Sequence, residues 1–148
     1  MREAGDTRAA AFKGLPPTYI PMKNLVYYGL AASYAEETAA SRIIGGHNKD
    51  DMRVFEDTSD LFFAQLQRAL WSSSSRLRRD QTRIVRPLRR LTKPEVVARA
   101  AGLGVPLQLT WSCHRDGEGH CWECPGCVAR TRAFIDAGLN DPLTSKKV

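Results

Sequence analysis

Four cysteines lie close together in the last third of this 148-residue chain, and they are its only cysteines. Their spacing is Cys113-x7-Cys121-x2-Cys124-x2-Cys127. Two overlapping Cys-x2-Cys steps and a fourth thiol across a short loop supply four soft ligands that can converge on a tetrahedral Zn²⁺. A catalytic zinc keeps one coordination position open for water or substrate, so a full set of four cysteines predicts a structural zinc site.

Other uses of these cysteines stay open from the sequence. The run from Cys121 to Cys127 also matches the first three ligands of a bacterial ferredoxin cluster, but the fourth cysteine lies upstream instead of downstream before a proline. Two disulfides are disfavoured, because no secretory signal precedes the cluster. His114 and His120 flank the site as substitute ligands, although four thiols already complete it.

The composition is that of an ordinary globular domain, with 43% hydrophobic and 26% charged residues. No apolar stretch approaches the roughly 18 residues that a membrane span needs, so we expect no membrane partner and a cytoplasmic location. The net charge of +6 is concentrated between Arg76 and Lys93, where Asp80 is the only acidic residue. That stretch has no aromatic residue for base stacking, which favours a solvated basic face over nucleic-acid binding.

The elements that must position these residues alternate between helix and strand. Asn24 can cap a helix whose buried face contains Leu25, Tyr28, Leu30, Ala31, Tyr34 and Ala35. A strand at 42–46, a helix from Ser59 to Leu70 and a flexible serine loop at 72–75 are expected next. Then follow a strand at 82–85, a helix from Thr92 with a capping box to Glu95, and a last helix from about Cys127 to Gly138. This order predicts an α/β fold with parallel strands.

Several segments together resemble 7-cyano-7-deazaguanine synthase. The matching segments, in chain order, are Tyr19-Ile20-Pro21-x2-Asn24, Ile43-Ile44-Gly45-Gly46-x-Asn48-x2-Asp51, Pro87-Leu88-x3-Thr92-Lys93-x-Glu95, and Leu109-Thr110-Trp111-Ser112-Cys113 with the later cysteines, Arg130, Phe134, Ala137-Gly138 and Asp141-Pro142. The resemblance runs from about Tyr19 to Leu143 and is most specific from Thr110 to Pro142.

The resemblance implies the parallel sheet of the adenine-nucleotide α-hydrolase-like (PP-loop) fold, with a C-terminal four-cysteine zinc loop and helix. It also implies the substrates 7-carboxy-7-deazaguanine and ammonia, with ATP and Mg²⁺. ATP would adenylate the carboxylate, ammonia would displace AMP to give an amide, and a second ATP would drive dehydration to the nitrile. Adenylation is needed because a carboxylate has no good leaving group, whereas AMP leaves readily.

One part of the family pattern is missing from the 148 residues. Family members carry a Ser-Gly-Gly-x-Asp-Ser loop that cradles the ATP pyrophosphate, and this sequence contains none. The chain is therefore expected to correspond to the C-terminal half to two-thirds of the enzyme, with an incomplete sheet. Truncation, a complementary ATP-loop subunit and loss of the ATP function are the three explanations, and the chain alone is expected to be inactive.

Five further residues are candidates for binding ATP or substrate by this resemblance: Asn24, Asn48, Asp51, Asp57 and Arg130. Each has a simpler interpretation, as a helix cap for Asn24, a solvated acidic loop for Asn48, Asp51 and Asp57, and an ion pair with Asp141 for Arg130. Phe55-Glu56-Asp57 replaces the Tyr-Pro-Asp common in the family, and Lys23 replaces an arginine, which loses a bidentate donor.

We expect a tail at 1–18, a partial nucleotide-hydrolase-like region at 19–108, a zinc-binding lobe at 109–143 and a tail at 144–148. The main functional hypothesis is a ligase that makes the nitrile. The alternatives are a non-catalytic zinc-bearing remnant that binds a partner or nucleic acid, and a relative that modifies another substrate. An incomplete sheet leaves apolar faces uncovered, which a homodimer or a complementary subunit can cover.

Overall fold

Helices and two short strands form the part of the chain that the computed structural model describes, which is Gly14 and residues 19–144. The two predicted tails therefore lie outside the described residues, except for Gly14 and Thr144. The elements, in chain order, are α2 (Lys23–Thr38), β1 (Arg42–Ile44), η1 (Asp51–Arg53), η2 (Glu56–Thr58), α3 (Asp60–Ser73), α4 (Ser75–Arg79), β2 (Arg83–Val85), α5 (Lys93–Gly102), η3 (Leu107–Leu109) and α6 (Pro125–Asp136).

Strands β1 and β2 lie side by side and run parallel, with Ile43 opposite Ile84. The predicted α/β class with parallel strands is thus confirmed, although the sheet of the described residues has only two strands. The chain passes from β1 to β2 through α3 and α4, since a parallel pair needs a long crossover connection. Strand β1 ends at Ile44, two residues before the predicted end, although the Gly45 N–H still donates to the Val85 carbonyl (2.9 Å).

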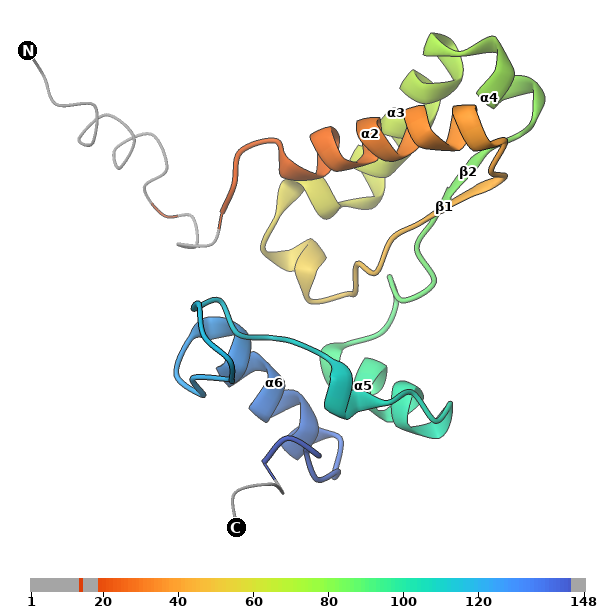
Figure 1. Cartoon of the computed structure of the whole chain (residues 1–148). Helices are drawn as coiled ribbons and strands as arrows, with labels where there is room; N and C mark the ends of the chain where they lie inside the picture. Colours follow the sequence, from red (N-terminus) through yellow and green to blue (C-terminus); the bar gives the residue numbers. More distant parts are fainter. Residues whose placement is uncertain (1–13, 15–18, 145–148) are drawn as a thin grey trace, which may run out of the picture.

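The main core lies where α2, α3 and α4 cover one face of these strands (Figure 1). It contains Tyr28, Ala32, Ala35, Ile43, Phe63, Leu66 and Leu77. The Tyr28 and Phe63 rings meet edge to face, with centroids 4.9 Å apart. The predicted buried face of α2 was partly wrong, because Leu25, Leu30 and Tyr34 are 39%, 66% and 68% exposed. Apolar residues surround this helix, so their spacing alone could not choose the buried side.

Two local predictions about polar residues were also wrong. Helix α2 begins at Lys23 after Met22, so Asn24 lies inside its first turn and is not the N-cap. The serine run is not a flexible loop, because Ser74 alone separates α3 from α4 and is buried. Its hydroxyl donates to Glu36 (2.6 Å) and accepts from the Leu77 N–H (3.1 Å). That geometry makes Ser74 the N-cap of α4 and ties the helix to α2.

Helices α5 and α6 pack on each other at the other end of the molecule, together with the cysteine loop (Figure 1). The predicted start of α5 is confirmed, since the Glu95 carboxylate accepts from the Thr92 N–H (2.7 Å) and hydroxyl (2.8 Å). The predicted end of α6 is confirmed at Gly138, which has φ +68°. A left-handed residue at this position lets the Leu139 N–H reach back to the Phe134 carbonyl (3.0 Å).

We call residues 19–91 the N-terminal lobe and residues 92–144 the C-terminal lobe. The structure places α5 beside α6, and the boundary predicted between residues 108 and 109 stays a prediction. Within the described part of the chain, no helix is both long and apolar enough to cross a membrane.

Gly45 provides a test of the packing between β1 and α2. A Cβ at this position would lie 1.7 Å from the Tyr28 hydroxyl oxygen, whereas a Cβ at Gly46 would meet nothing within 4 Å. We expect Gly45→Ala to lower the free energy of unfolding by about 1–3 kcal/mol, because the buried tyrosine must shift. Gly46→Ala should change it by less than about 0.5 kcal/mol. Urea unfolding of both variants checks this, and equal effects would contradict the packing.

Candidate functional site

The four cysteines converge in the C-terminal lobe, as their spacing predicts. Their sulfur atoms all lie within 4.8 Å of one another. Four sulfurs about 2.3 Å from a tetrahedrally bound ion lie roughly 3.8 Å apart, so a small contraction would complete such a site. An iron-sulfur cluster places cysteines on different iron atoms, which spreads the sulfurs further apart than a single ion does. All four thiols are free, without a disulfide.

Backbone N–H groups point at these sulfurs because of how the loop folds onto α6. Cys124 is the N-cap of α6 and its sulfur accepts from the Cys127 N–H (3.5 Å) and the His114 N–H (3.3 Å). The Cys113 sulfur accepts from the Arg115 N–H (3.4 Å) and the Cys121 N–H (3.5 Å). Donors aimed at sulfur stabilise the thiolate form, which is the form that binds a metal.

The pKa values of Cys124 and Cys127 differ because the two thiols differ in backbone donors and in burial. The N–H groups of His114 and Cys127 lower the pKa of Cys124 to about 6. Burial raises the pKa of Cys127 to about 11, since this side chain is fully enclosed. A bound dication would offset the cost of charging the buried thiol. The donor set therefore suits a metal ion such as zinc.

Gly126 permits the close contact between the cysteine loop and α6. A Cβ at this position would lie 2.0 Å from the Ser112 carbonyl oxygen and 2.7 Å from His114 Nε2. On the other side of the loop, His120 Nε2 accepts from the Ser112 N–H (3.0 Å), and its ring lies 4.4 Å from that of Trp111. His120 therefore supports the loop as a hydrogen-bond acceptor, while the four sulfurs face one another.

Asn24 and Asp57 come together in the N-terminal lobe, from α2 and η2. The Asn24 N–H donates to Asp57 Oδ2 (3.3 Å), and its side-chain amide donates to the Asp57 carbonyl (3.1 Å). Both residues line a pocket of about 160 Å³ that also contains Asp51. Three of the five predicted binding residues thus share one pocket, near the carboxyl end of β1, where ligands bind in parallel α/β folds.

Asn48 and Asp51 form a tight polar turn after β1. The Asn48 side-chain oxygen accepts from the N–H groups of Asp50 (2.9 Å) and Asp51 (3.3 Å), and Asp51 Oδ2 accepts from the Asn48 N–H (3.1 Å). Asn48 is buried and lines a different pocket, of about 330 Å³, together with Arg130. Its fixed position orients the Asp51 carboxylate.

His47 is a pocket residue that the sequence analysis did not select. It lines the same pocket as Asn24 and Asp57, and its ring packs against Tyr28 and Phe63 at 5.9 and 5.2 Å. Burial lowers the pKa of His47 more than the nearby carboxylates raise it, so the imidazole is neutral at pH 7. The sequence signal that could have identified His47 is its position just after the Gly-Gly pair at the end of β1.

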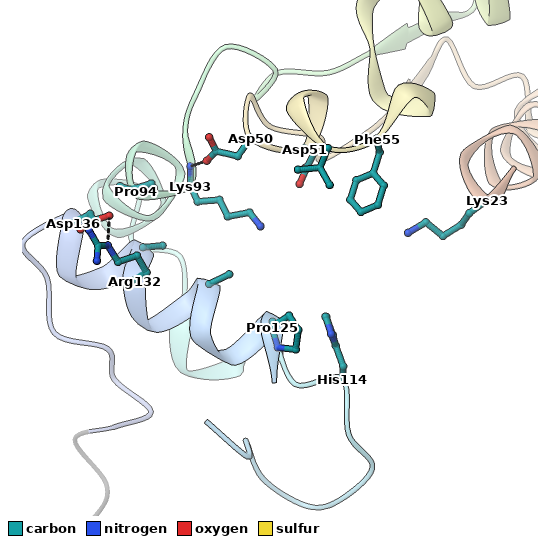
Figure 2. A pocket seen from close by; sticks show the side chains of 14 residues that line it. Lys23, Asp50, Asp51, Phe55, Lys93, Pro94, His114, Pro125, Arg132 and Asp136 are labelled. Atoms are coloured by element: carbon teal, nitrogen blue, oxygen red, sulfur yellow. Dashed lines mark hydrogen bonds and ion pairs between the residues drawn. The ribbon is translucent and has the colours of Figure 1, made fainter. Parts of the chain in front are cut away.

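A larger cavity of about 610 Å³ lies between the two lobes. Figure 2 shows the side chains of Lys23, Asp51 and Phe55 on one side of it, with Lys93 from α5 and His114 from the cysteine loop on the other. Lys23, Asp51 and Phe55 also line the smaller pocket, so the two spaces adjoin. A volume of this size is within the usual range for small-molecule sites.

Arg130 holds the C-terminal lobe together. Its guanidinium donates to the Asp141 carboxylate from Nε (2.5 Å) and Nη2 (2.8 Å), and this predicted ion pair is confirmed. The other donors reach the Thr110 hydroxyl (2.6 Å) and the Leu107 carbonyl (3.1 Å). The two charged side chains are only 8% and 5% exposed. Whether Arg130 also meets a ligand stays a prediction.

The basic stretch is not simply a solvated face. The Arg86 side chain is 9% exposed, pairs with Asp60 (2.7 Å) and lies over the Phe63 ring (4.1 Å). The Arg83 guanidinium lies 4.3 Å from the Trp71 ring centroid. Arg76 and Arg79 remain largely exposed on α4. Part of the positive charge therefore serves packing of the N-terminal lobe.

These features define an α/β protein with a small parallel sheet, a polar pocket beside the end of β1, and a C-terminal four-cysteine cluster suited to a metal ion. The family model described as queuosine biosynthesis protein QueC matches residues 3–138, and the chain belongs to this family.

Curated relatives carry the name 7-cyano-7-deazaguanine synthase. The protein from Thermoplasma acidophilum is 35% identical over 133 residues, which is 90% of this chain and 56% of that protein. The relative from Nostoc sp. is 36% identical over 135 residues, covering 90% of this chain and 59% of its own. The relative from Sulfurovum sp. is 34% identical over 91% of this chain and 60% of its own. The chain thus spans somewhat more than half the length of these relatives.

Because the Arg130–Asp141 pair is buried, we expect substitution of Arg130 to destabilise the protein much more than substitution of Arg132 on the same helix. We expect Arg130→Met to lower the free energy of unfolding by about 3–5 kcal/mol, because it leaves Asp141 buried without its partner. Arg132→Met, which removes an exposed pair with Asp136 (2.9 Å), should cost less than about 1 kcal/mol. Chemical denaturation measures both, and a small cost at Arg130 would contradict the role of the pair.

The Arg130–Asp141 pair also predicts how the stability of the protein changes with pH. Burial alone would raise the pKa of Asp141, but hydrogen bonds from Arg130 and from the Leu143 N–H bring it below the ordinary 3.8. The stabilisation is therefore fully present above about pH 4 and is lost as the pH falls below that value. Acid should accordingly reduce the difference in stability between the wild type and Arg130→Met.

Proposed function

We propose that this chain forms the substrate-binding and metal-binding portion of a 7-cyano-7-deazaguanine synthase with the PP-loop fold. The family match over residues 3–138 carries the proposal. The polar pocket after β1 and the adjoining cavity between the lobes supply a place for a planar bicyclic substrate. An enzyme of this class converts 7-carboxy-7-deazaguanine, ammonia and ATP into the nitrile.

The residues of the pocket suit the donor-rich edge of a guanine-like ring. Such a ring presents an N–H and an amino group side by side, and carboxylates accept from both. Asp51 and Asp57 line the pocket, and each is held by a backbone N–H of a neighbouring asparagine. Neutral His47 can donate or accept one further hydrogen bond without adding charge. These side chains would bind and orient the ring while its carboxylate is activated.

Activation requires ATP at the substrate carboxylate. Transfer of AMP to the carboxylate releases pyrophosphate, and attack by ammonia then releases AMP and leaves the amide. A second ATP removes the amide oxygen in the same manner and leaves the nitrile. Mg²⁺ would neutralise the phosphate charge during each transfer. We propose that the Ser-Gly-Gly-x-Asp-Ser loop for these phosphates comes from polypeptide outside these 148 residues, as part of a longer chain or of a complementary subunit.

We further propose that Cys113, Cys121, Cys124 and Cys127 bind one structural Zn²⁺. Four thiolates leave no coordination position for water or substrate, so the ion would stabilise the lobe and take no part in the chemistry. The apolar core of the cysteine loop contains little beyond the cysteines themselves. A lobe with so small an apolar core needs such a cross-link.

The exposed side of α2 is a candidate surface for a partner. Tyr27, Leu30 and Tyr34 are each at least 60% exposed and lie on one stripe of the helix. A homodimer or the complementary subunit remains the predicted occupant. The cytoplasmic location also remains a prediction, and no observation favours nucleic acid as the partner over a small-molecule substrate.

Metal analysis tests the zinc proposal. We expect one Zn²⁺ per chain, and we expect Cys124→Ser or removal of the metal by a chelator to unfold the C-terminal lobe. Ser72→Ala, at an exposed position on α3, should retain the metal and the fold. Atomic emission and circular dichroism provide the measurements. An iron-sulfur absorption band, or a fully folded protein without metal, would contradict the proposal.

Turnover tests the enzymatic proposal. The purified 148-residue chain, given 7-carboxy-7-deazaguanine, ammonia, ATP and Mg²⁺, should form no AMP, because the phosphate loop is absent from its sequence. Addition of a polypeptide with the Ser-Gly-Gly-x-Asp-Ser half of a relative should restore nitrile formation. In that mixture Asp57→Asn should reduce kcat/KM about 10-fold or more, since a charged acceptor is lost. The proposal fails if the mixture binds neither the acid nor the nitrile.

A further inference from the structure

Two lysines enter the cavity between the lobes from opposite sides. Lys23 is the first residue of α2 in the N-terminal lobe, and Lys93 is the first residue of α5 in the C-terminal lobe. Figure 2 shows both side chains extending into the open space, with their nitrogen ends directed inward. Both residues are half-buried. Two segments far apart in the chain thus present two ammonium groups to one cavity.

The acidic residues of the cavity form no ion pair with these two ammonium groups within the described residues. Asp136 pairs with Arg132 (2.9 Å), and Asp50 Oδ2 accepts from the backbone N–H of Lys93 (2.8 Å). Asp51 Oδ2 accepts from the Asn48 N–H (3.1 Å). Among residues 19–144 no ion pair engages the ammonium of Lys23 or Lys93. Both ammonium groups are therefore available to bind an anionic group of a ligand.

The remaining walls of the cavity suit a flat, largely apolar body. The Phe55 ring extends from the N-terminal lobe, and Pro94 and Pro125 lie at the starts of α5 and α6 (Figure 2). Ala129 and Ala133 complete the surface on α6. An aromatic ring can stack on a planar ligand, and proline and alanine allow its close approach. Phe55 also lines the adjoining polar pocket, so a ligand packed on its ring lies close to the polar groups there.

We propose that Lys23 and Lys93 are the residues that select the anionic group of the substrate, by binding the carboxylate of the bicyclic acid while Phe55 packs against its ring. This inference rests on the proposed function and adds the specificity-determining residues. Two cations at half-buried positions favour a carboxylate over the neutral nitrile of the same ring system. The arrangement would therefore retain the acid and let the nitrile leave.

Binding of the acid and of the nitrile to the purified metal-loaded chain, measured by calorimetry, tests the pair. The probes are 7-carboxy-7-deazaguanine and 7-cyano-7-deazaguanine, which share the ring and differ in charge. The variants are Lys23→Gln, Lys93→Gln and Lys93→Arg. Lys49→Gln is the matched control, because Lys49 is an exposed lysine near the same turn that does not line the cavity. The backbone N–H of Lys93 that binds Asp50 is retained in every variant.

We expect the wild type to bind the acid at least tenfold more tightly than the nitrile. Lys23→Gln and Lys93→Gln should each weaken binding of the acid about tenfold or more, the range of a lost charge-assisted hydrogen bond, and should change binding of the nitrile less than about threefold. Lys93→Arg should keep most of the preference, and Lys49→Gln should keep all of it.

Two results would overturn the inference, and they can be told apart. If the wild type binds both ligands and the glutamine variants weaken both equally, or neither, the lysines do not select the carboxylate and the proposed function stands. If the wild type binds neither ligand, alone or mixed with the polypeptide that supplies the Ser-Gly-Gly-x-Asp-Ser half, both the proposed function and the inference that rests on it fail.

Discussion

One hydrogen bond joins the two lobes at the start of α5, a second fixes the chain just before it, and the cavity between the lobes lies beside them. Asp50 Oδ2 accepts from the Lys93 N–H, and the Lys49 N–H donates to the Leu91 carbonyl, both at 2.8 Å. A carboxylate at the N-terminus of a helix also meets the positive end of its dipole. The same turn contains Asn48 and Asp51, so one short segment after β1 fixes both the polar pocket and the position of the C-terminal lobe.

The two lobes are stabilised by different means. Aromatic and aliphatic side chains form the core of the N-terminal lobe, with Tyr28, Phe63 and Leu66 at its centre. The C-terminal lobe relies on polar cross-links, since its buried groups are mainly the cysteines, Phe134 and the Arg130–Asp141 pair. Such a lobe has little apolar area to bury, so directional bonds supply much of its stability, and a metal ion held by the four cysteines would add to it. Directional bonds also fix geometry, which is useful in a lobe that lines a binding cavity.

Much of the fold and of the candidate site could be predicted from local patterns. The parallel strand pair, the capping box at Thr92, the Gly138 helix end and the four-cysteine cluster all follow from short-range spacing, and the structure confirms them. The errors have a common cause in tertiary contacts. Asn24 was predicted to cap α2, but its N–H and amide bind Asp57, 33 residues away. The serine run suggests a loop at Ser74, but Glu36, 38 residues away, fixes this residue between two helices.

The sequence by itself determined the family, the four-cysteine cluster and the order of elements, because these depend on residue types at fixed short separations. Only the tertiary structure decided which side of α2 is buried, that His47 enters the polar pocket, and that Lys23 and Lys93 meet across one cavity. Long-range placement is set by burial of Tyr28, Ala32 and Ala35 and by the hydrogen bonds of the turn at 48–51. Those contacts join segments that are far apart in the chain. Local sequence patterns describe only neighbouring residues, so they could not predict these contacts.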